Sequence, residues 1–205
     1  MSMNLKVCLL CLAFGTTLTA AAQYEKEDGV NGAPGSPTWS ASSGSMIYFY
    51  KQQLNGFDYN GINTLAVLGV RYNFKYLGKS TSLSVGSYPG LGVAFFSGFG
   101  QSNVFFSFDL PLLLELHTGV DAHPNAMQNG VGFFMGGGMG INFLSREFYL
   151  NNPRSGFSYG PTGGGGIKLN FGGRPITLRG SYMLNFNPDL PDLKAVGILW
   201  SMGGR

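Results

Sequence analysis

The sequence predicts an all-β fold, an eight-stranded antiparallel up-and-down β-barrel of the transmembrane kind. Three observations predict it. Only 11% of the 205 residues are charged, while 44% are hydrophobic, and an ordinary soluble domain carries roughly 25% charge. Beyond the N-terminal segment no apolar run reaches the about 18 residues that a membrane-spanning helix requires. Long stretches instead alternate between apolar and polar residues with a period of two, which is the period of a β-strand.

The N-terminal segment, residues 1–22, has the order of a secretory signal peptide. Lys6 precedes an apolar run at 7–14, and small residues follow up to Ala22, so we expect export and cleavage after Ala22. Both cysteines, Cys8 and Cys11, lie inside this segment. Disulfides and cysteine–metal chemistry are therefore not expected in the rest of the chain.

After the signal, residues 23–44 are polar and rich in Gly, Ser and Pro, and we interpret them as a flexible lead-in. The barrel is predicted over 45–205. The strongest alternation covers 103–118, where one face holds Val104, Phe106, Phe108, Leu110, Leu112, Leu114 and Leu116. Seven further strands are expected at 45–54, 66–76, 81–98, 129–144, 158–171, 175–187 and 194–203. Closing such strands into a ring pairs every backbone N–H and C=O, which a lipid solvent requires.

Two groups of side chains are predicted from the faces of these strands. An eight-stranded barrel is just wide enough inside to be filled by side chains, so charges on the polar faces should pair across the lumen. This lumen charge network is expected to contain Arg71, Lys75, Asp109, Glu115, Lys168 and Arg179. Aromatic residues near strand ends should form interfacial belts, and the residues expected there are Tyr72, Phe74, Tyr76, Phe171, Phe186 and Trp200.

Other chemistry has little support in the sequence. The basic residues are spread along the chain and not clustered, so no nucleic-acid partner is expected. The glycine-rich run 160–168 resembles a phosphate-binding loop only superficially, because Ile167 separates the last glycine from Lys168 and no Ser or Thr follows. The two histidines, His117 and His123, do not form a metal site, and no motif-bearing nucleophile accompanies them. We expect no cofactor, no metal and no enzymatic activity.

This layout resembles the small eight-stranded outer-membrane barrels of Gram-negative bacteria, of the OmpA/OmpX membrane-domain type. The resemblance covers nearly all of 45–205 and rests on architecture, since no diagnostic motif carries it. It implies an outer-membrane location, lipid contact and insertion by the barrel-assembly machinery. The chain departs from the family by ending in Trp200 followed by Ser201, Met202 and 203–205, without a terminal aromatic residue.

The functional expectation is a monomeric outer-membrane protein with a structural, envelope-stabilising or surface-interaction role and a filled lumen. The connection 145–157 is the preferred surface for a partner, because function in such barrels commonly lies on loops. One alternative is a narrow porin-like pore for small solutes. The other is a soluble periplasmic lipocalin-like barrel that binds an apolar ligand inside, which would require the polar faces to point outward.

Overall fold

The computed structural model describes residues 37–54, 57–77, 80–98, 101–122, 130–144, 156–170, 174–186 and 190–202. The predicted signal segment and most of the lead-in lie outside these ranges. None of the described residues belongs to a helix long and apolar enough to cross a membrane.

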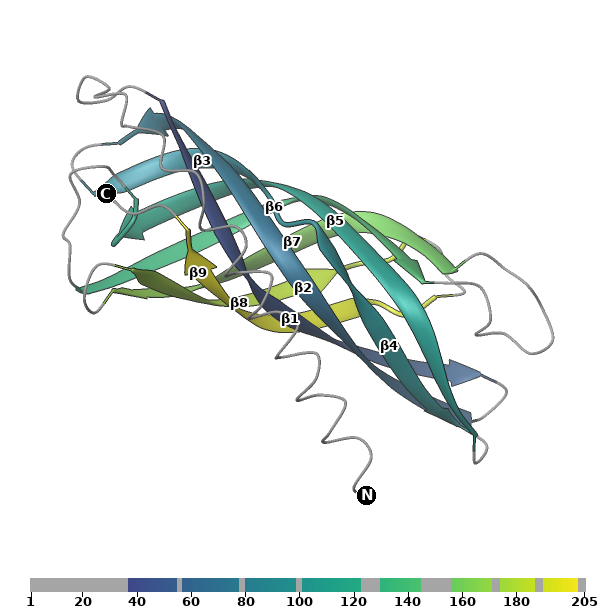
Figure 1. Cartoon of the computed structure of the whole chain (residues 1–205). Coiled ribbons are helices and arrows are strands. Elements are labelled where there is room, and N and C mark those ends of the chain that lie inside the picture. The colour runs from purple at the N-terminus through teal and green to yellow at the C-terminus, as the bar shows by residue number, and fades with distance from the viewer. Residues whose placement is uncertain are drawn as a thin grey trace.

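The strands close into one antiparallel ring (Figure 1). They are β1 (Thr38–Leu54), β2 (Phe57–Tyr76), β3 (Thr81–Ser87), β4 (Gly90–Gly98), β5 (Gln101–Gly119), β6 (Gly130–Leu144), β7 (Gly156–Asn170), β8 (Pro175–Met183) and β9 (Leu193–Ser201). Strands consecutive in the sequence pair with each other, except β3 and β4, and β9 pairs with β1 to complete the circle. The predicted all-β, antiparallel barrel is confirmed.

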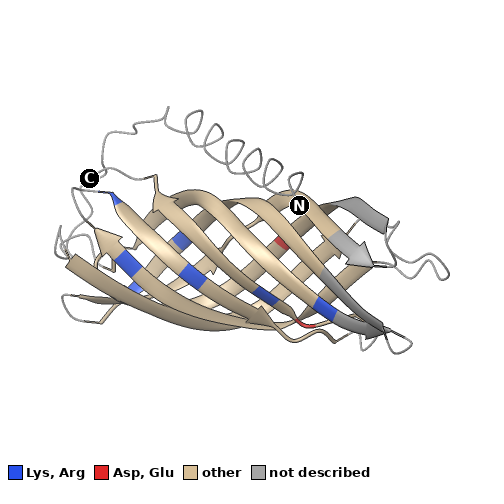
Figure 2. Cartoon of the chain, turned by 90° about the horizontal axis from the view of Figure 1, so that it is seen from below, with Lys and Arg blue, Asp and Glu red and all other residues tan. Residues whose placement is uncertain are grey.

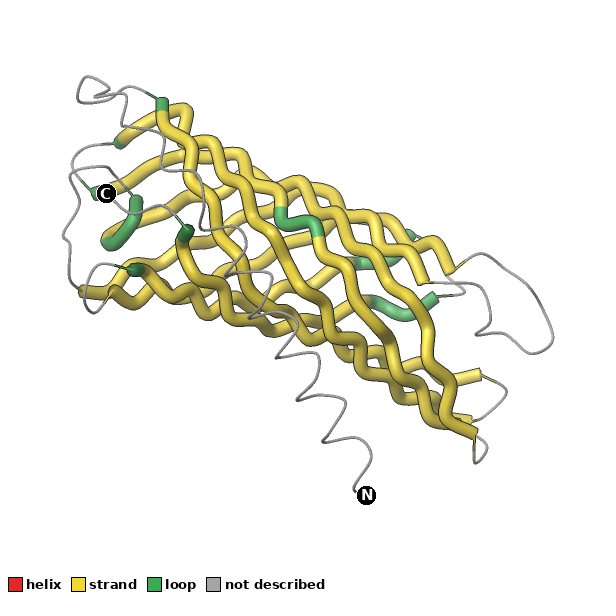
Figure 3. The backbone as a smooth tube through the Cα atoms, viewed as in Figure 1, coloured by secondary structure: helices red, strands yellow, loops and turns green. Residues whose placement is uncertain are grey.

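Nine segments make an eight-membered ring because β3 and β4 share one place in it. Both pair with β2 on one side and with β5 on the other. Tyr88 and Pro89 interrupt this strand, visible as a green break between two yellow stretches in Figure 3. Pro89 has no N–H to donate, so the ladder cannot continue unbroken through it. The single strand expected at 81–98 is therefore present in two parts.

The first strand begins earlier than the sequence predicted. β1 starts at Thr38, whereas the lead-in was expected to run to residue 44 and the barrel to begin at 45. Residues 38–44 are small and polar and show no alternation of faces, so the pattern did not mark them. They are held in the sheet by pairing with β2, from Thr38↔Asn73 to Gly44↔Val67.

The two surfaces of the ring are inverted relative to a soluble barrel. The outer face of β5 carries Phe106, Leu110, Leu112, Leu114 and Leu116, each 38% exposed or more. The inner face of the same strand carries Ser107, Asp109, Glu115 and His117, each at most 6% exposed. Figure 2 shows how few charged residues the strands carry. An apolar outside around a polar inside is the organisation that a lipid solvent requires, and it excludes the soluble lipocalin-like alternative, whose polar faces would point outward.

Exposed aromatic rings gather near the two ends of the barrel, which we name after the ends of β1. The Thr38 end carries Trp39, Phe74, Phe133 and Trp200, and the Leu54 end carries Phe106, Phe143, Phe157, Tyr159 and Phe186. Leu, Ile, Val and Met dominate the outer surface between them. Aromatic belts at both membrane–water interfaces have this distribution.

At the Leu54 end four strands extend beyond the ring. β1 pairs with β9 only as far as Phe49, but with β2 as far as Leu54. β5 pairs with β6 only from Ser107 onward, but with β4 from Gln101. The outer parts of β1, β2, β4 and β5 therefore form a four-stranded wall whose two margins have no neighbouring strand among the described residues; Figure 1 shows these strands reaching furthest at that end.

A charge on the outer face should destabilise the barrel in lipid. Leu114 is 54% exposed near the middle of β5, so Leu114→Arg places a cation in hydrocarbon and should cost about 2–4 kcal/mol of unfolding free energy. Denaturant unfolding in phospholipid vesicles measures this. Leu114→Ile is the matched control and should unfold like the original chain. Equal stability of the Arg and Ile variants would show that this face does not contact lipid.

Candidate functional site

The centre of the lumen is a buried ion pair surrounded by aromatic rings. Arg179 of β8 places a guanidinium nitrogen 2.8 Å from Oε1 of Glu115 on β5. The same guanidinium lies over the ring of Tyr88, 4.0 Å from its centroid, and 5.1 Å from that of Phe134. The Tyr88 hydroxyl donates to Oε2 of Glu115 at 2.7 Å. Burial of two opposite charges is tolerable here because hydrogen bonds and ring faces accompany the pair.

Tyr88 reaches the lumen from the break between β3 and β4, and two glycines make room for its ring. A Cβ on Gly69 would come 2.6 Å from the Tyr88 ring, and one on Gly86 would come 2.9 Å from Oε2 of Glu115. Neither position could carry a larger residue without moving the ring or the carboxylate. The sequence analysis missed Tyr88, although the Tyr-Pro pair inside a predicted strand marked the interruption.

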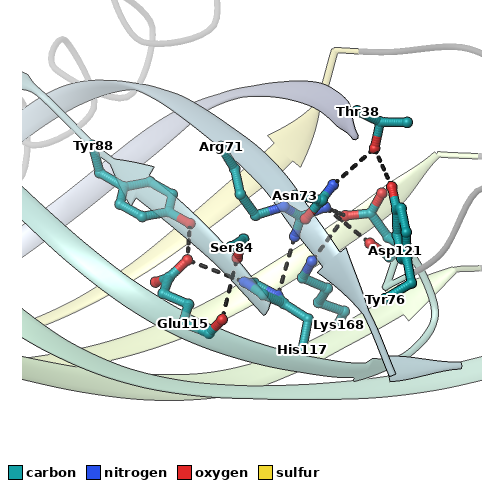
Figure 4. Close-up of polar contacts among 10 residues, drawn as sticks. All are labelled: Thr38, Arg71, Asn73, Tyr76, Ser84, Tyr88, Glu115, His117, Asp121 and Lys168. Atoms are coloured by element: carbon teal, nitrogen blue, oxygen red, sulfur yellow. Dashed lines mark hydrogen bonds and ion pairs between the residues drawn. The ribbon is translucent and has the colours of Figure 1, made fainter. Parts of the chain in front are cut away.

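His117 joins this pair to a second cluster (Figure 4). Its Nε2 lies 3.1 Å from Oε2 of Glu115, and its Nδ1 lies 3.1 Å from a guanidinium nitrogen of Arg71. Arginine can only donate, so Nδ1 accepts and Nε2 carries the proton that is donated to Glu115. The imidazole also stacks on Phe134, with ring centroids 5.4 Å apart. Both ring nitrogens are therefore engaged, and the side chain is buried.

The second cluster lies at the Thr38 end and centres on Asp121. Oδ2 of Asp121 accepts from Arg71 at 2.9 Å and from Nζ of Lys168 at 2.8 Å. Asp121 belongs to the turn after β5, outside the strands. Burial alone would raise the pKa of its carboxyl, but Lys168 and Arg71 outweigh that effect and hold the pKa well below its usual range. Sequence reasoning missed this residue because turns carry no periodic signal.

A third group fills the lumen toward the Leu54 end. Tyr48 donates its hydroxyl hydrogen to Asp109, and Nδ2 of Asn142 lies 3.3 Å from the other carboxylate oxygen. Asn63 donates to the hydroxyls of Tyr50 and Ser107, at 3.0 and 2.6 Å. Polar side chains thus fill the lumen at this level as well.

Two small cavities of about 20 Å³ each lie among the described residues of the lumen, and each has room for about one water molecule. One lies beside Tyr48 and Asp109, and the other beside Arg71 and Lys168. Only Tyr88 and Arg179 line both cavities. Their side chains therefore form the partition between the two halves of the lumen.

The structure brings together five of the six residues expected in the lumen charge network. Arg71, Asp109, Glu115, Lys168 and Arg179 are at most 6% exposed inside the ring. Lys75 is exposed and lies outside the network, contrary to the sequence interpretation. A bulge between Asn73 and Lys75 inserts one extra residue, Phe74, into β2. Because successive side chains alternate faces, this insertion moves Lys75 to the outer face, opposite Leu83.

The same bulge turns Tyr76 away from the belt in which the sequence placed it. Tyr76 is opposite Ser82, which is fully buried inside, and its hydroxyl contacts that of Thr38. Of the other expected belt residues, Tyr72 is half-buried against Trp39, with ring centroids 4.6 Å apart. Three are exposed, namely Phe74, Phe186 and Trp200. Phe171 lies outside the described residues. His123 and residues 145–155 also lie outside them.

Metal coordination has no support among the described residues, which include no group of three or more His, Cys, Asp or Glu side chains able to hold an ion. No protein-family model and no curated protein matches the sequence.

Solved structures similar in fold include the outer membrane protein OprG of Pseudomonas aeruginosa, at 11% identity over 84% of this chain and 96% of that one, with a TM-score of 0.42. The outer membrane enzyme PagL is 12% identical over 81% of this chain and 98% of its own, with a TM-score of 0.42. Ail, the attachment invasion locus protein of Yersinia pestis, is 15% identical over 81% and 95%, with a TM-score of 0.46. The closed antiparallel ring with an apolar outer surface is the architecture on which the expected resemblance to small outer-membrane β-barrels rested.

Removing one buried cation should cost far more stability than removing an exposed one. Arg179→Gln leaves Glu115 buried without its ion-pair partner and should lower the unfolding free energy by about 3–5 kcal/mol. Lys75→Gln removes the same charge from the outside and should change the unfolding free energy by about 0.5 kcal/mol or less. Denaturant unfolding in vesicles compares the two. Equal losses would place Lys75, and not only Arg179, in the lumen network.

The Asp121 cluster should make stability depend on acidic pH. A carboxyl whose pKa is lower in the folded than in the unfolded state contributes stability above the unfolded pKa of about 4 and loses it as pH falls further. The charged groups that face it are Arg71 and Lys168. The thermal midpoint of the barrel should therefore drop between about pH 6 and pH 3 by more than that of Asp121→Asn, since that variant has no carboxyl to protonate. Parallel pH profiles would contradict this assignment.

Proposed function

We propose that this chain is an outer-membrane β-barrel with a sealed lumen that acts through its place in the membrane and its surface, in a structural, envelope-stabilising or surface-interaction role. The observation that carries the proposal is the filled lumen. Three cations, Arg71, Lys168 and Arg179, face the carboxylates of Asp109, Glu115 and Asp121 inside a ring whose cavities each hold about one water. Within the part of the chain that the structure describes, these side chains fill the lumen at the level of both cavities.

A role without catalysis is part of this proposal, and the state of His117 supports it. A general base needs a ring nitrogen that can accept a proton from a substrate or nucleophile. Nδ1 of His117 accepts from Arg71, Nε2 donates to Glu115, and the side chain is 1% exposed. The side chains of Glu115 and His117 thereby take part in the hydrogen bonds and ion pairs that stabilise the lumen.

A role at the surface draws support from the four-stranded wall at the Leu54 end. Among the described strands, β1 beyond Phe49 is bordered by β2 alone and β5 before Ser107 by β4 alone, so these two segments are the margins of the wall. The margin of a sheet is the usual place where an extended segment of a partner adds to it. The connection 145–157, which the sequence favoured as a contact surface, begins at the same end of the barrel, after β6.

Conductance in planar lipid bilayers tests the sealed lumen. The purified chain should give no discrete current steps, because Tyr88 and Arg179 separate the two cavities. Tyr88→Ala removes one of these side chains and should produce small, discrete steps. Tyr159→Ala removes an aromatic ring from the outer face, where Tyr159 is 45% exposed, and should stay silent.

Steady ion conductance by the unaltered chain would favour the alternative role, a narrow pore for small solutes, over the sealed barrel. Silence of Tyr88→Ala would show that the partition is not what closes the lumen.

A further inference from the structure

Two buried cations at the Thr38 end converge on one oxygen atom. Lys168 comes from β7 and Arg71 from β2, strands that are not neighbours in the ring, and their side chains are 4% and 7% exposed. Both donate to Oδ2 of Asp121, at 2.8 and 2.9 Å (Figure 4). Without that oxygen the two positive charges would face each other in a poorly solvated space, which is costly. The pair is therefore built around an anionic oxygen.

The carboxylate that meets them comes from a turn and not from the barrel wall. Gly119 and Asp121 both have positive φ angles, 78° and 59°, and the N–H of Ala122 bonds the carbonyl of Gly119 at 3.2 Å. A non-glycine residue in this left-handed region is held there at some cost in conformational energy. Val120 and Ala122 are 2% and 0% exposed, so the turn is folded into the mouth of the lumen.

The site has a further donor that Asp121 does not use. Arg71 gives one guanidinium nitrogen to His117 and the other to the carboxylate and carbonyl of Asp121. Its Nε is buried and makes no hydrogen bond with the described residues. A cavity of about 20 Å³ adjoins Arg71, His117 and Lys168. An oxyanion there could accept from a third N–H as well as from the two groups that Asp121 engages.

We propose that Arg71 and Lys168 form a binding site for a small oxyanion, a carboxylate or phosphate group, which Asp121 occupies as an intramolecular ligand. The turn 119–122 is then an autoinhibitory lid on the mouth of the lumen, held down by its own carboxylate. A free oxyanion and Asp121 exclude one another, so filling the site from solution accompanies release of the lid. This inference concerns the mouth alone and does not depend on whether the partition at Tyr88 conducts.

Chemical rescue tests the binding site. Asp121→Asn removes the negative charge but keeps a residue that tolerates positive φ. In chloride buffer the thermal midpoint of this variant, followed by the heat-dependent shift in gel mobility, should fall by several degrees. Sodium acetate or inorganic phosphate at the same ionic strength should restore it in a saturable way, while the unaltered chain shows no such response. The two anions separately report whether carboxylate or phosphate fits.

The double variant Asp121→Asn with Lys168→Gln is the control, because it lacks one of the two cations. Acetate or phosphate should not stabilise it. Equal stabilisation of the unaltered chain, the single variant and the double variant would be a general salt effect and would overturn the proposal. If Asp121→Asn does not fold, Asp121→Gly, which removes the strain at positive φ together with the charge, takes its place in the same comparison.

A thiol at position 122 tests the lid separately. In a chain with Cys8 and Cys11 replaced by serine, Ala122→Cys should react slowly with a water-soluble maleimide, because Ala122 is fully buried. Adding Asp121→Asn should speed labelling roughly tenfold or more, as expected when a hydrogen bond to a charged group is lost from a closed state. Acetate should then restore the thermal midpoint without slowing the labelling. Slow labelling in acetate would mean that the lid closes over the anion, which contradicts mutual exclusion.

Discussion

Closure of the ring between β1 and β9 is the constraint on which the other features depend. In lipid an unpaired strand edge has no water to bond, so the first and last strands must meet. They pair from Ser42↔Ser201 to Phe49↔Lys194, and glycines stand on both sides of this seam. A Cβ on Gly44 would collide with the backbone of Ile198 and Leu199, and one on Gly197 would lie 2.5 Å from the Met46 side chain and 2.6 Å from the Ser45 carbonyl. The close approach of the two strands therefore requires the smallest residue at both positions.

A closed ring of eight strands is narrow. Its outer surface must present apolar side chains to lipid, whereas its interior must accommodate polar and charged side chains. Side chains largely fill the lumen, yet many of the inward residues are polar or charged, because the strands alternate apolar residues that face outward with polar residues that face inward. The buried charges among the described residues lie against other charges or against hydroxyl and amide groups, as Glu115 does with Arg179 and Asp109 with Tyr48. The same contacts that stabilise the interior also close it. For this reason the filled lumen supports the proposed structural or surface role over transport.

Alternation was enough to predict the fold class, the ring of eight and most of the lumen charges, because a strand with unbroken register fixes the face of each side chain. It failed where the register breaks. One extra residue in β2 moved Lys75 and Tyr76 to faces opposite to those expected, and the break before Pro89 brought Tyr88 inside. It also failed where neither face is apolar, at the start of β1, and where there is no period at all, at Asp121. The structure at these positions is determined by contacts with segments distant in the sequence, and the local alternation of residues does not indicate those contacts.

The residues that escaped prediction are also the ones that the lumen depends on for its closure. Tyr88 enters through an interrupted strand and Asp121 through a turn with positive φ, so both are local departures from regular structure. Such departures cost conformational energy and persist only when their surroundings determine them. At Asp121 the surroundings are two cations on strands that are not neighbours in the ring, and the carboxylate therefore links β2, β5 and β7 across the mouth. A link made by a few charged contacts on a short turn opens more readily than the sheet that carries it, so the turn 119–122 can be released while the ring of strands stays closed.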